Sequence, residues 1–517
     1  MSQRFLALSL LCTACSATPP LMEGRQSGDE LGHDEPNDVD VATVETRGMA
    51  KAKTQPIAQK DDGPRIAAIE SHVWIMPKPA HEGLALGNVR LGTSVRLRGA
   101  TPVPGNGCRA WYAVEPRGYV CHNFRTTLDL KDPYFRALAE VAPKRGELFP
   151  YSYAYARDAP MYSRVPTQSE WEKEERRFKP AGTYAELGDW AKGHEELIEN
   201  TPIEATDPVP WFFADGKRHI GGGVRDPKRL LWKVIPNGSM LAYARAFEMH
   251  GRVWLVTSDL TVVPADRVQK IRRSKFRGVD LNDKVTLPIA WNRRLEPRPL
   301  YRKVDGAWVD SGERVSGKGW RMITGEKSGA GSDPYWELRD RPGLFMKGKD
   351  TTVSWPRKEL PPAIAPDEKW MEARITPGTL TAFVGLKPVY ATLFSPGKGG
   401  HPVPGHDHTK YATTQTGFFR LEWKERTATM SNEKGEPKIL WFSDVPHIQY
   451  IKAPLAMHVA YWHEDFSTPK SAECVNLSPS DGRWMFDWTD PPLPADWGAI
   501  GPGRGAGKST AIVIYGL

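Results

Sequence analysis

The stretch that decides the fold reads HVAYWHEDFSTPKSAECVNLSPSDGRW and covers residues 458–484. It opens on His458, and Cys474 follows 16 residues later. A cysteine nucleophile needs a base that removes its proton or holds it as thiolate. We therefore expect His458 on one strand and Cys474 at the start of the next, with the two side chains meeting across a sheet.

Strand patterns continue outward from this stretch. Residues 369–398 read KWMEARITPGTLTAFVGLKPVYATLFSPGK, which predicts two strands joined by a turn at Pro377-Gly378. Further strands are predicted in TTQTGFFRLEWK at 413–424 and in ILWF at 439–442. Alternating apolar residues of this kind are typical of a β-rich domain rather than a helical one.

These stretches together resemble the L,D-transpeptidase catalytic domain, also called the YkuD domain, over residues 367–517. That family is a β-sandwich that remodels bacterial peptidoglycan. The resemblance implies that Cys474 is the nucleophile and His458 the general base and acid. Ser471 and Asn476 match supporting positions, and Glu473 stands where the backbone would support an oxyanion or bind substrate.

Two residues depart from the family's motif. The family carries His and Gly directly before the cysteine, and this chain has Ala472 and Glu473. A Gly at such a place often permits a positive φ, where Glu473 would cost about 1 kcal/mol or more. The departures leave two interpretations open: an active enzyme, or a non-catalytic peptidoglycan-binding lipoprotein built on a degenerate transpeptidase domain.

The enzyme interpretation implies acyl transfer on peptidoglycan stem peptides, without a cofactor. Cys474 would attack the carbonyl before a terminal D-Ala, and an acceptor would then take the acyl group. The sequence leaves the acceptor open among another stem, a lipoprotein, a free D-amino acid and water.

Other histidines offer weaker sites. HPVPGHDH at 401–408 carries His401, His406 and His408 with Asp407, but on a Gly/Pro loop without Cys or Glu partners. We therefore expect a polar loop near the substrate groove rather than a metal site. His463 is a candidate second active-site histidine, against the default of an exposed loop position.

The first residues predict export. Arg4, the apolar run from Phe5 to Leu11 and the small residues before Cys15 are typical of a secretory signal in residues 1–15. Cys15 after Thr-Ala resembles a lipoprotein cleavage site, which predicts a membrane attachment through lipid on the periplasmic side of a bacterial cell envelope. Plain secretion is the alternative. Residues 16–63 predict a disordered tether, because they are polar and acidic and lack aromatic residues.

The remaining cysteines fit an exported chain. Cys108 and Cys121 lie close in sequence and predict a disulfide, which leaves Cys474 as a free thiol. Both lie in residues 64–130, whose short strands resemble a bacterial Src-homology-3-like barrel. Residues 131–366 predict an intermediate β-rich region, with a possible second barrel near 205–272.

Composition sets the outer limits. The chain has 517 residues, with 47 Gly and 45 Pro, which favours turns and short strands over long helices. The predicted fold class is mainly β: small barrel-like modules, then an L,D-transpeptidase-type sandwich, with few helices. A net charge of +8 without a basic block argues against nucleic acid as a partner. The sequence contains no run of 18 apolar residues, so we expect no transmembrane helix.

Overall fold

The structure is a computed structural model that describes residues 63–178, 196–216, 229–329, 333–408, 410–431, 441–501 and 507–516. The predicted signal segment 1–15, with Cys15, and almost all of the tether 16–63 lie outside these residues. Within them strands predominate over helices, which confirms the mainly β fold class. None of the described helices is long and apolar enough to cross a membrane.

The N-terminal unit (residues 64–130) packs two small sheets around one core. Ile66, Val95 and Val120 fill that core from both sheets. A disulfide joins Cys108 to Cys121. The barrel-like character of this unit stays a prediction. Its strands are β1 (Arg65–Ala68), β2 (Val73–Met76), β3 (Gly87–Val89), β4 (Ser94–Arg96), β5 (Ala110–Ala113), β6 (Tyr119–His122) and β7 (Thr126–Thr127).

The middle unit (residues 131–273) begins earlier than the sequence pattern at 205–272 indicated. Its strands β8 and β9 lie upstream of that range, yet β9 pairs with β10 and β14, and β8 pairs with β11 and β15. Their buried tyrosines, Tyr155 and Tyr162, complete cores that the later strands cannot fill alone. The elements are α1 (Pro133–Glu140), β8 (Ser152–Ala156), β9 (Ala159–Tyr162), α2 (Gln168–Glu175), η2 (Trp211–Gly216), β10 (Leu231–Ile235), β11 (Met240–Tyr243), β12 (Arg245–Met249), β13 (Arg252–Val256), β14 (Val262–Pro264), η3 (Ala265–Arg267) and β15 (Val268–Lys270).

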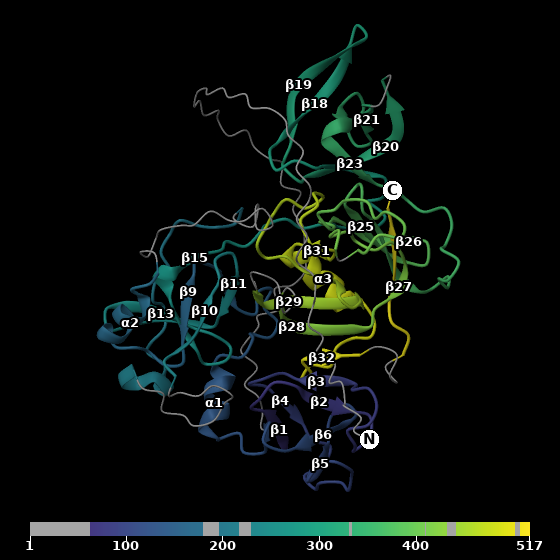
Figure 1. Ribbon diagram of the computed structural model, residues 1–517. Helices are drawn as coiled ribbons and strands as arrows, with labels where there is room; N and C mark the ends of the chain where they lie inside the picture. Colours follow the sequence, from purple (N-terminus) through teal and green to yellow (C-terminus); the bar gives the residue numbers. More distant parts are fainter. Residues whose placement is uncertain are drawn as a thin grey trace.

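A third unit (residues 287–355), the projecting unit, stands apart at the top of Figure 1, with the hairpin β18–β19 at its tip. It forms its own sheet in the order β19-β18-β22-β21-β20-β17-β23. Leu300, Ile323 and Leu338 form its core. Its elements are β17 (Ile289–Asn292), β18 (Arg298–Val304), β19 (Ala307–Val315), β20 (Trp320–Ser328), β21 (Tyr335–Leu338), β22 (Phe345–Lys347), η4 (Gly348–Asp350) and β23 (Thr351–Ser354).

The C-terminal unit (residues 367–516, with the short strand β16 at 279–280 added at one edge) is a sandwich of two layers. One layer is the sheet β16-β26-β25-β24-β33-β27, and the other contains β28 to β31. Met371 and Leu380 of the first layer meet Met457 and Leu477 of the second in one core. The turn predicted at Pro377-Gly378 lies between β24 and β25 and is confirmed. The strands are β16 (Val279–Asp280), β24 (Lys369–Arg374), β25 (Thr379–Val384), β26 (Lys387–Leu393), β27 (Gly417–Arg420), β28 (Trp423–Ser431), β29 (Trp441–Lys452), β30 (Leu455–Val459), β31 (Val475–Leu477), β32 (Ala499–Ile500) and β33 (Ala511–Tyr515).

Helix α3 (Pro479–Trp488) follows β31 after one residue. Ser478 caps its N-terminus by accepting from the Asp481 backbone N–H at 3.1 Å, and Pro479 provides a first helical residue that needs no partner for its nitrogen. The Asp481 carboxylate then accepts hydrogen bonds from Tyr390 and Thr392 on β26. Helix α3 is thereby fixed to the first layer of the sandwich.

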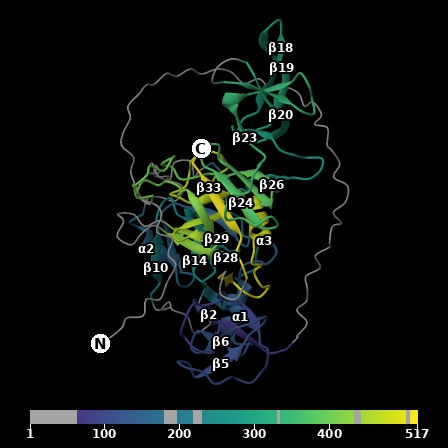
Figure 2. The ribbon, with the colours of Figure 1, turned by 90° about the vertical axis from the view of Figure 1, so that its right-hand side faces the viewer.

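One continuous sheet connects three of the units. Its order is β15-β8-β11-β29-β28-β32-β3-β2-β6-β5, from the middle unit through the C-terminal unit to the N-terminal unit. Figure 1 shows it running from the left through the centre to the bottom, and Figure 2 shows the N-terminal unit below the sandwich in the turned view. Strand β11 pairs in parallel with β29, and the short β32 pairs with both β28 and β3.

Asp444 on β29 holds the same three units together by its side chain and backbone. Its carboxylate pairs with Arg90 of the N-terminal unit and accepts a hydrogen bond from Ser258 of the middle unit at 2.9 Å. Its carbonyl accepts from Tyr153 at 2.9 Å. Burial alone favours neutral Arg90, but Asp444 outweighs it and raises the pKa of that guanidinium. The pair is therefore a buried ion pair with supporting hydrogen bonds.

We predict that Asp444→Asn destabilises the chain by roughly 3–5 kcal/mol, because it leaves the Arg90 charge buried without a counter-charge. Asn tolerates the positive φ of 46° at this position, so the substitution tests the charge rather than the backbone. Urea unfolding measures the change. Asp280→Asn, in an exposed pair with Arg277, is the control and should leave the midpoint unchanged. Equal midpoints for Asp444→Asn and the wild type would contradict this role.

Candidate active site

His458 and Cys474 lie at one pair of parallel strands. Strand β30 pairs with β31 so that His458 stands beside Asn476. Cys474 directly precedes β31, so the segments that carry the two residues are neighbours in the sheet. That His458 serves as the base for Cys474 stays a prediction.

Cys474 is a free thiol with 5% of its surface exposed. Its Sγ donates a weak hydrogen bond to the carbonyl of Pro454, at 3.9 Å, just before β30 begins. It packs in the core cluster that also contains Trp462 and, from the middle unit, Tyr153. The cluster that contains the thiol thus extends into the middle unit.

The imidazole of His458 is held in one orientation. Its Nδ1 lies 3.1 Å from the carbonyl oxygen of Val459. A carbonyl only accepts, so Nδ1 carries a proton in this contact. His458 is 3% exposed, and its ring packs 5.8 Å from that of Trp462. Nε2 is then the ring nitrogen through which His458 would act as a base.

Ser471 and Asn476 hold the segment around the thiol. The Ser471 hydroxyl donates to the Cys474 carbonyl at 2.6 Å, which closes a tight turn over residues 471–474. Asn476 exchanges two backbone hydrogen bonds with Ser395, each of 3.0 Å. Both residues therefore position the nucleophile through the backbone.

His463 is buried, so the expectation of an exposed loop histidine is wrong. Its side chain is 0% exposed because the 460–468 loop folds inward beneath Phe466. Its Nε2 lies 3.3 Å from the side-chain nitrogen of Asn476. His463 thus contacts the side chain of Asn476, which lies two residues after Cys474.

The histidines of the 401–408 loop do not join this group. His406 stacks on Tyr411 at 4.6 Å between ring centroids, and His408 contacts the Thr413 hydroxyl at 3.1 Å. Among the described residues, His, Cys, Asp and Glu side chains form no cluster of three or more that would hold a metal ion.

Glu473, the residue before the nucleophile, is almost fully buried. Its side chain is 3% exposed, and Oε1 has no hydrogen-bond partner within the described part of the chain. Burial, and secondly the charge of Asp407, raise the pKa of this carboxyl to about 7. Its φ is not positive, so the strain expected of a side chain in place of Gly does not arise.

The backbone of Glu473 is tied to the 395–414 loop, which contains the stretch 401–408 that the sequence predicted as a polar loop near the substrate groove. Thr414 donates its hydroxyl to the Glu473 carbonyl at 2.8 Å and accepts from the Gly397 backbone N–H at 2.8 Å. Lys398 donates its backbone N–H to the carbonyl of Ser471 at 2.7 Å. No local sequence pattern predicts this role of Thr414, because its partner, Glu473, is 59 residues away in the sequence.

The raised pKa of Glu473 predicts a pH-dependent stability. Between about pH 4.5 and 7 the folded state binds a proton that the unfolded state has released, so stability falls as the pH rises through this window. Glu473→Gln should remove that fall and stabilise the chain above pH 7 by roughly 3 kcal/mol. Urea unfolding at several pH values measures it, with Glu172→Gln on α2 as an exposed control. A pH profile unchanged by Glu473→Gln would show that the carboxyl ionises normally.

Comparison with known proteins places the C-terminal part in a family. The model for the L,D-transpeptidase catalytic domain, YkuD, matches residues 368–503. No curated protein matches the chain. The match lies within residues 367–517, where the sequence resemblance was stated, and confirms it.

Solved structures of similar proteins include L,D-transpeptidases from three bacteria. The one from Xylanimonas cellulosilytica is 19% identical, with 30% of this chain and 64% of that chain covered and a TM-score of 0.19. The one from Stackebrandtia nassauensis is 19% identical, with coverages of 29% and 57% and a TM-score of 0.19. The catalytic domain of the E. faecium enzyme is 17% identical, with coverages of 29% and 98% and a TM-score of 0.21.

The chain thus spans less than two thirds of the length of the first two of these relatives. Superpositions with TM-scores of this size carry no structural argument, and the assignment rests on the family match and its residues. Residues 368–503 match the family model of the L,D-transpeptidase catalytic domain, YkuD.

Proposed function

We propose that the chain is a cysteine acyltransferase of the L,D-transpeptidase type that acts on peptidoglycan stem peptides. The observation that carries the proposal is the parallel pairing of β30, which carries His458, with β31, which begins directly after Cys474. The Nδ1 atom of His458 lies against a carbonyl. This leaves Nε2 as the atom that takes the thiol proton.

The first half-reaction forms a thioester. Nε2 of His458 accepts the Cys474 proton as the sulfur attacks the carbonyl before the terminal D-Ala of a stem peptide. The developing oxyanion requires backbone donors close to the sulfur. Ser471 and Thr414 fix the carbonyls of residues 474 and 473, and we assign the backbone N–H groups of this turn to the oxyanion. Protonated His458 then gives its proton to the departing amine of D-Ala.

The second half-reaction releases the acyl group. The amine of a second stem attacks the thioester, His458 removes the amine proton, and Cys474 leaves as thiolate and is reprotonated. An amide bond forms and a thioester breaks, so the chemistry balances without a cofactor.

Acylation of the thiol tests this proposal. We predict that a carbapenem adds covalently to the wild type, as detected by intact mass, and that Cys474→Ala abolishes the adduct. His458→Ala should slow adduct formation roughly 100-fold, the usual scale for a positioned base. His463→Ala is the matched control, since His463 supports Asn476 and should have a smaller effect.

Absence of an adduct on wild-type Cys474, together with no D-Ala release from tetrapeptide stems, would contradict the proposal that the chain is an enzyme. It would favour the other candidate, a non-catalytic wall-binding lipoprotein, because binding of stem peptides needs no reactive thiol.

The location proposed for this activity is the periplasmic side of a bacterial envelope, with Cys15 as the site of lipid attachment. The apolar run before Cys15 and the polar segment 16–63 support it. Two or three acyl chains would give stable attachment. We predict palmitate incorporation into the wild type and none into Cys15→Ser. Equal labelling of both proteins, or of neither, would contradict the lipid attachment.

A further inference from the structure

A small cavity lies where residues 141–151, the connector between α1 and β8, meet the C-terminal unit. Residues 143–147 of the connector form one wall and β28 and β29 a second. Helix α3, the turn at 496–498, and Arg90 and Thr93 of the N-terminal unit complete the lining. Its volume is about 50 Å³. At about 10–15 Å³ per water, this is room for about three to five waters, so the cavity suits a single small group rather than a sugar ring or a peptide.

The cavity walls carry more positive than negative charge. Five basic side chains and three acidic ones line it, and since Arg90 is paired with Asp444 outside the lining, an excess of one positive charge remains. The basic residues are Arg90, Lys144, Arg145, Arg426 and Arg483, and the acidic residues are Glu147, Asp487 and Asp496. Arg145 is bound to Asp496 at 2.7 Å, and Arg483 to Asp487. The two arginines are held in place by these carboxylates.

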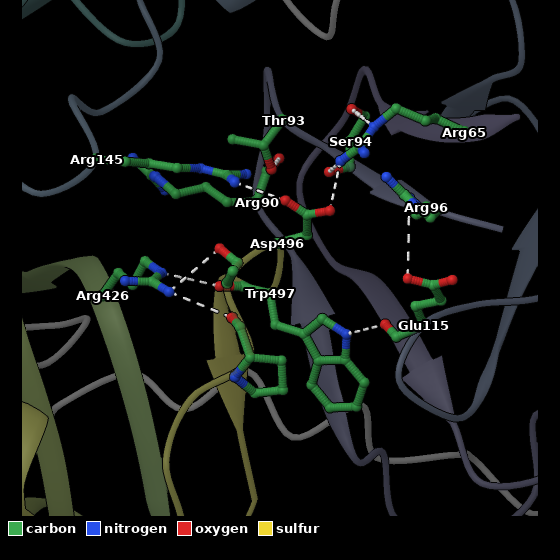
Figure 3. A network of polar contacts seen from close by, with 12 residues as sticks. Arg65, Arg90, Thr93, Ser94, Arg96, Glu115, Arg145, Arg426, Asp496 and Trp497 are labelled. Carbon is green, nitrogen blue, oxygen red and sulfur yellow. Dashed lines mark hydrogen bonds and ion pairs between the residues drawn. The ribbon is translucent and has the colours of Figure 1, made fainter. Parts of the chain in front are cut away.

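Arg426 on β28 is held by backbone carbonyls rather than by a direct ion pair. Its Nε donates to the Trp497 carbonyl at 3.0 Å, and its Nη2 donates to the carbonyls of Pro494 and Ala495. Within the described residues no carboxylate lies within ion-pair distance of it. Burial lowers the pKa of Arg426, the charges of Arg145 and Arg483 lower it further, and the charges of Asp487 and Asp496 oppose this shift. Figure 3 shows Arg145 and Arg426 reaching the 494–497 turn from the same side.

His447 on β29 adds an unused polar atom to the same wall. The register of β28 and β29 places it opposite Arg426. It is 8% exposed, and its buried Nδ1 has no hydrogen-bond partner among the described residues. Burial, then Arg483 and Arg426, lower the pKa of His447 to about 3, so the ring is neutral. A neutral imidazole donates one N–H, and a small acceptor in the cavity would satisfy it.

We propose that this cavity binds the phosphate group of a small anion or of a phosphate-bearing lipid. Guanidinium groups match phosphate oxygens in pairs, and Arg145, Arg426 and Arg483 surround the space from three different segments. The bound phosphate would join the connector to α3, which already meet where Arg483 donates to the carbonyls of Gly146 and Glu147 at 3.2 Å. The site is independent of the proposed acyl transfer.

Phosphate-specific stabilisation of the full chain tests this site. Thermal unfolding is measured in inorganic phosphate and in sodium chloride of equal ionic strength. Phosphate should raise the Tm saturably, and chloride should not. Arg483→Gln and Arg145→Gln should each weaken the apparent phosphate affinity by about tenfold. Arg277→Gln, an exposed arginine outside the cavity, is the matched control and should keep the wild-type affinity.

A second variant separates binding from folding. His447→Phe keeps an aromatic ring against Phe486 and removes the ring nitrogens, and it should keep the fold while losing phosphate affinity. Circular dichroism without phosphate checks the fold of every variant. Equal stabilisation by phosphate and chloride, or equal phosphate affinity in Arg483→Gln and Arg277→Gln, would overturn the proposal.

The source of the phosphate is decided by a parallel measurement. Vesicles of phosphatidic acid in phosphatidylcholine are sedimented with the chain, against pure phosphatidylcholine vesicles. Binding to phosphatidic acid that Arg483→Gln abolishes would support a lipid source. Saturable stabilisation by inorganic phosphate without vesicle binding would support a free anion. The absence of both responses would overturn the proposal.

Discussion

The carboxylate of Asp444 is the contact on which the arrangement of three units depends. It is 3% exposed and lies at the middle of the continuous sheet, where β29 has the middle unit on one side and β28 on the other. The charge of Arg90 and the hydroxyl of Ser258 reach it from two different units. A buried pair of this kind adds little net stability over apolar packing, but breaking it is costly. Asp444 therefore specifies how the units are placed more than it stabilises any one of them.

The candidate site depends on this arrangement through its packing. Cys474 shares a core cluster with Tyr153 and Met240 of the middle unit, and Tyr153 is the residue that binds the Asp444 carbonyl. The ring of Tyr153 stacks on Tyr461 at 3.9 Å between centroids, three residues beyond His458. Displacing the middle unit would thus change the support of the loop that carries Trp462 and His463.

Local patterns in the sequence predicted much of the site but little of its setting. The alternation around His458 and Cys474 predicted two strands, and they pair directly. The hairpin at Pro377-Gly378 was likewise readable, because a turn signal lay between two alternating runs. Burial of His463 was not readable, since it depends on Phe466 and Asn476, which only the folded loop brings to it. The continuous sheet was hidden for the same reason: β3 and β32 pair across about 400 residues, and no local pattern encodes such a pairing.

The central claim is that Cys474 forms a thioester with a stem peptide. The most direct measurement is intact mass after incubation with a tetrapeptide stem and no acceptor amine. The account predicts a mass increase on Cys474 equal to the stem peptide minus its terminal D-Ala, sensitive to hydroxylamine and absent from Cys474→Ala. Release of D-Ala by both the wild type and Cys474→Ala, with no adduct on the thiol, would contradict it.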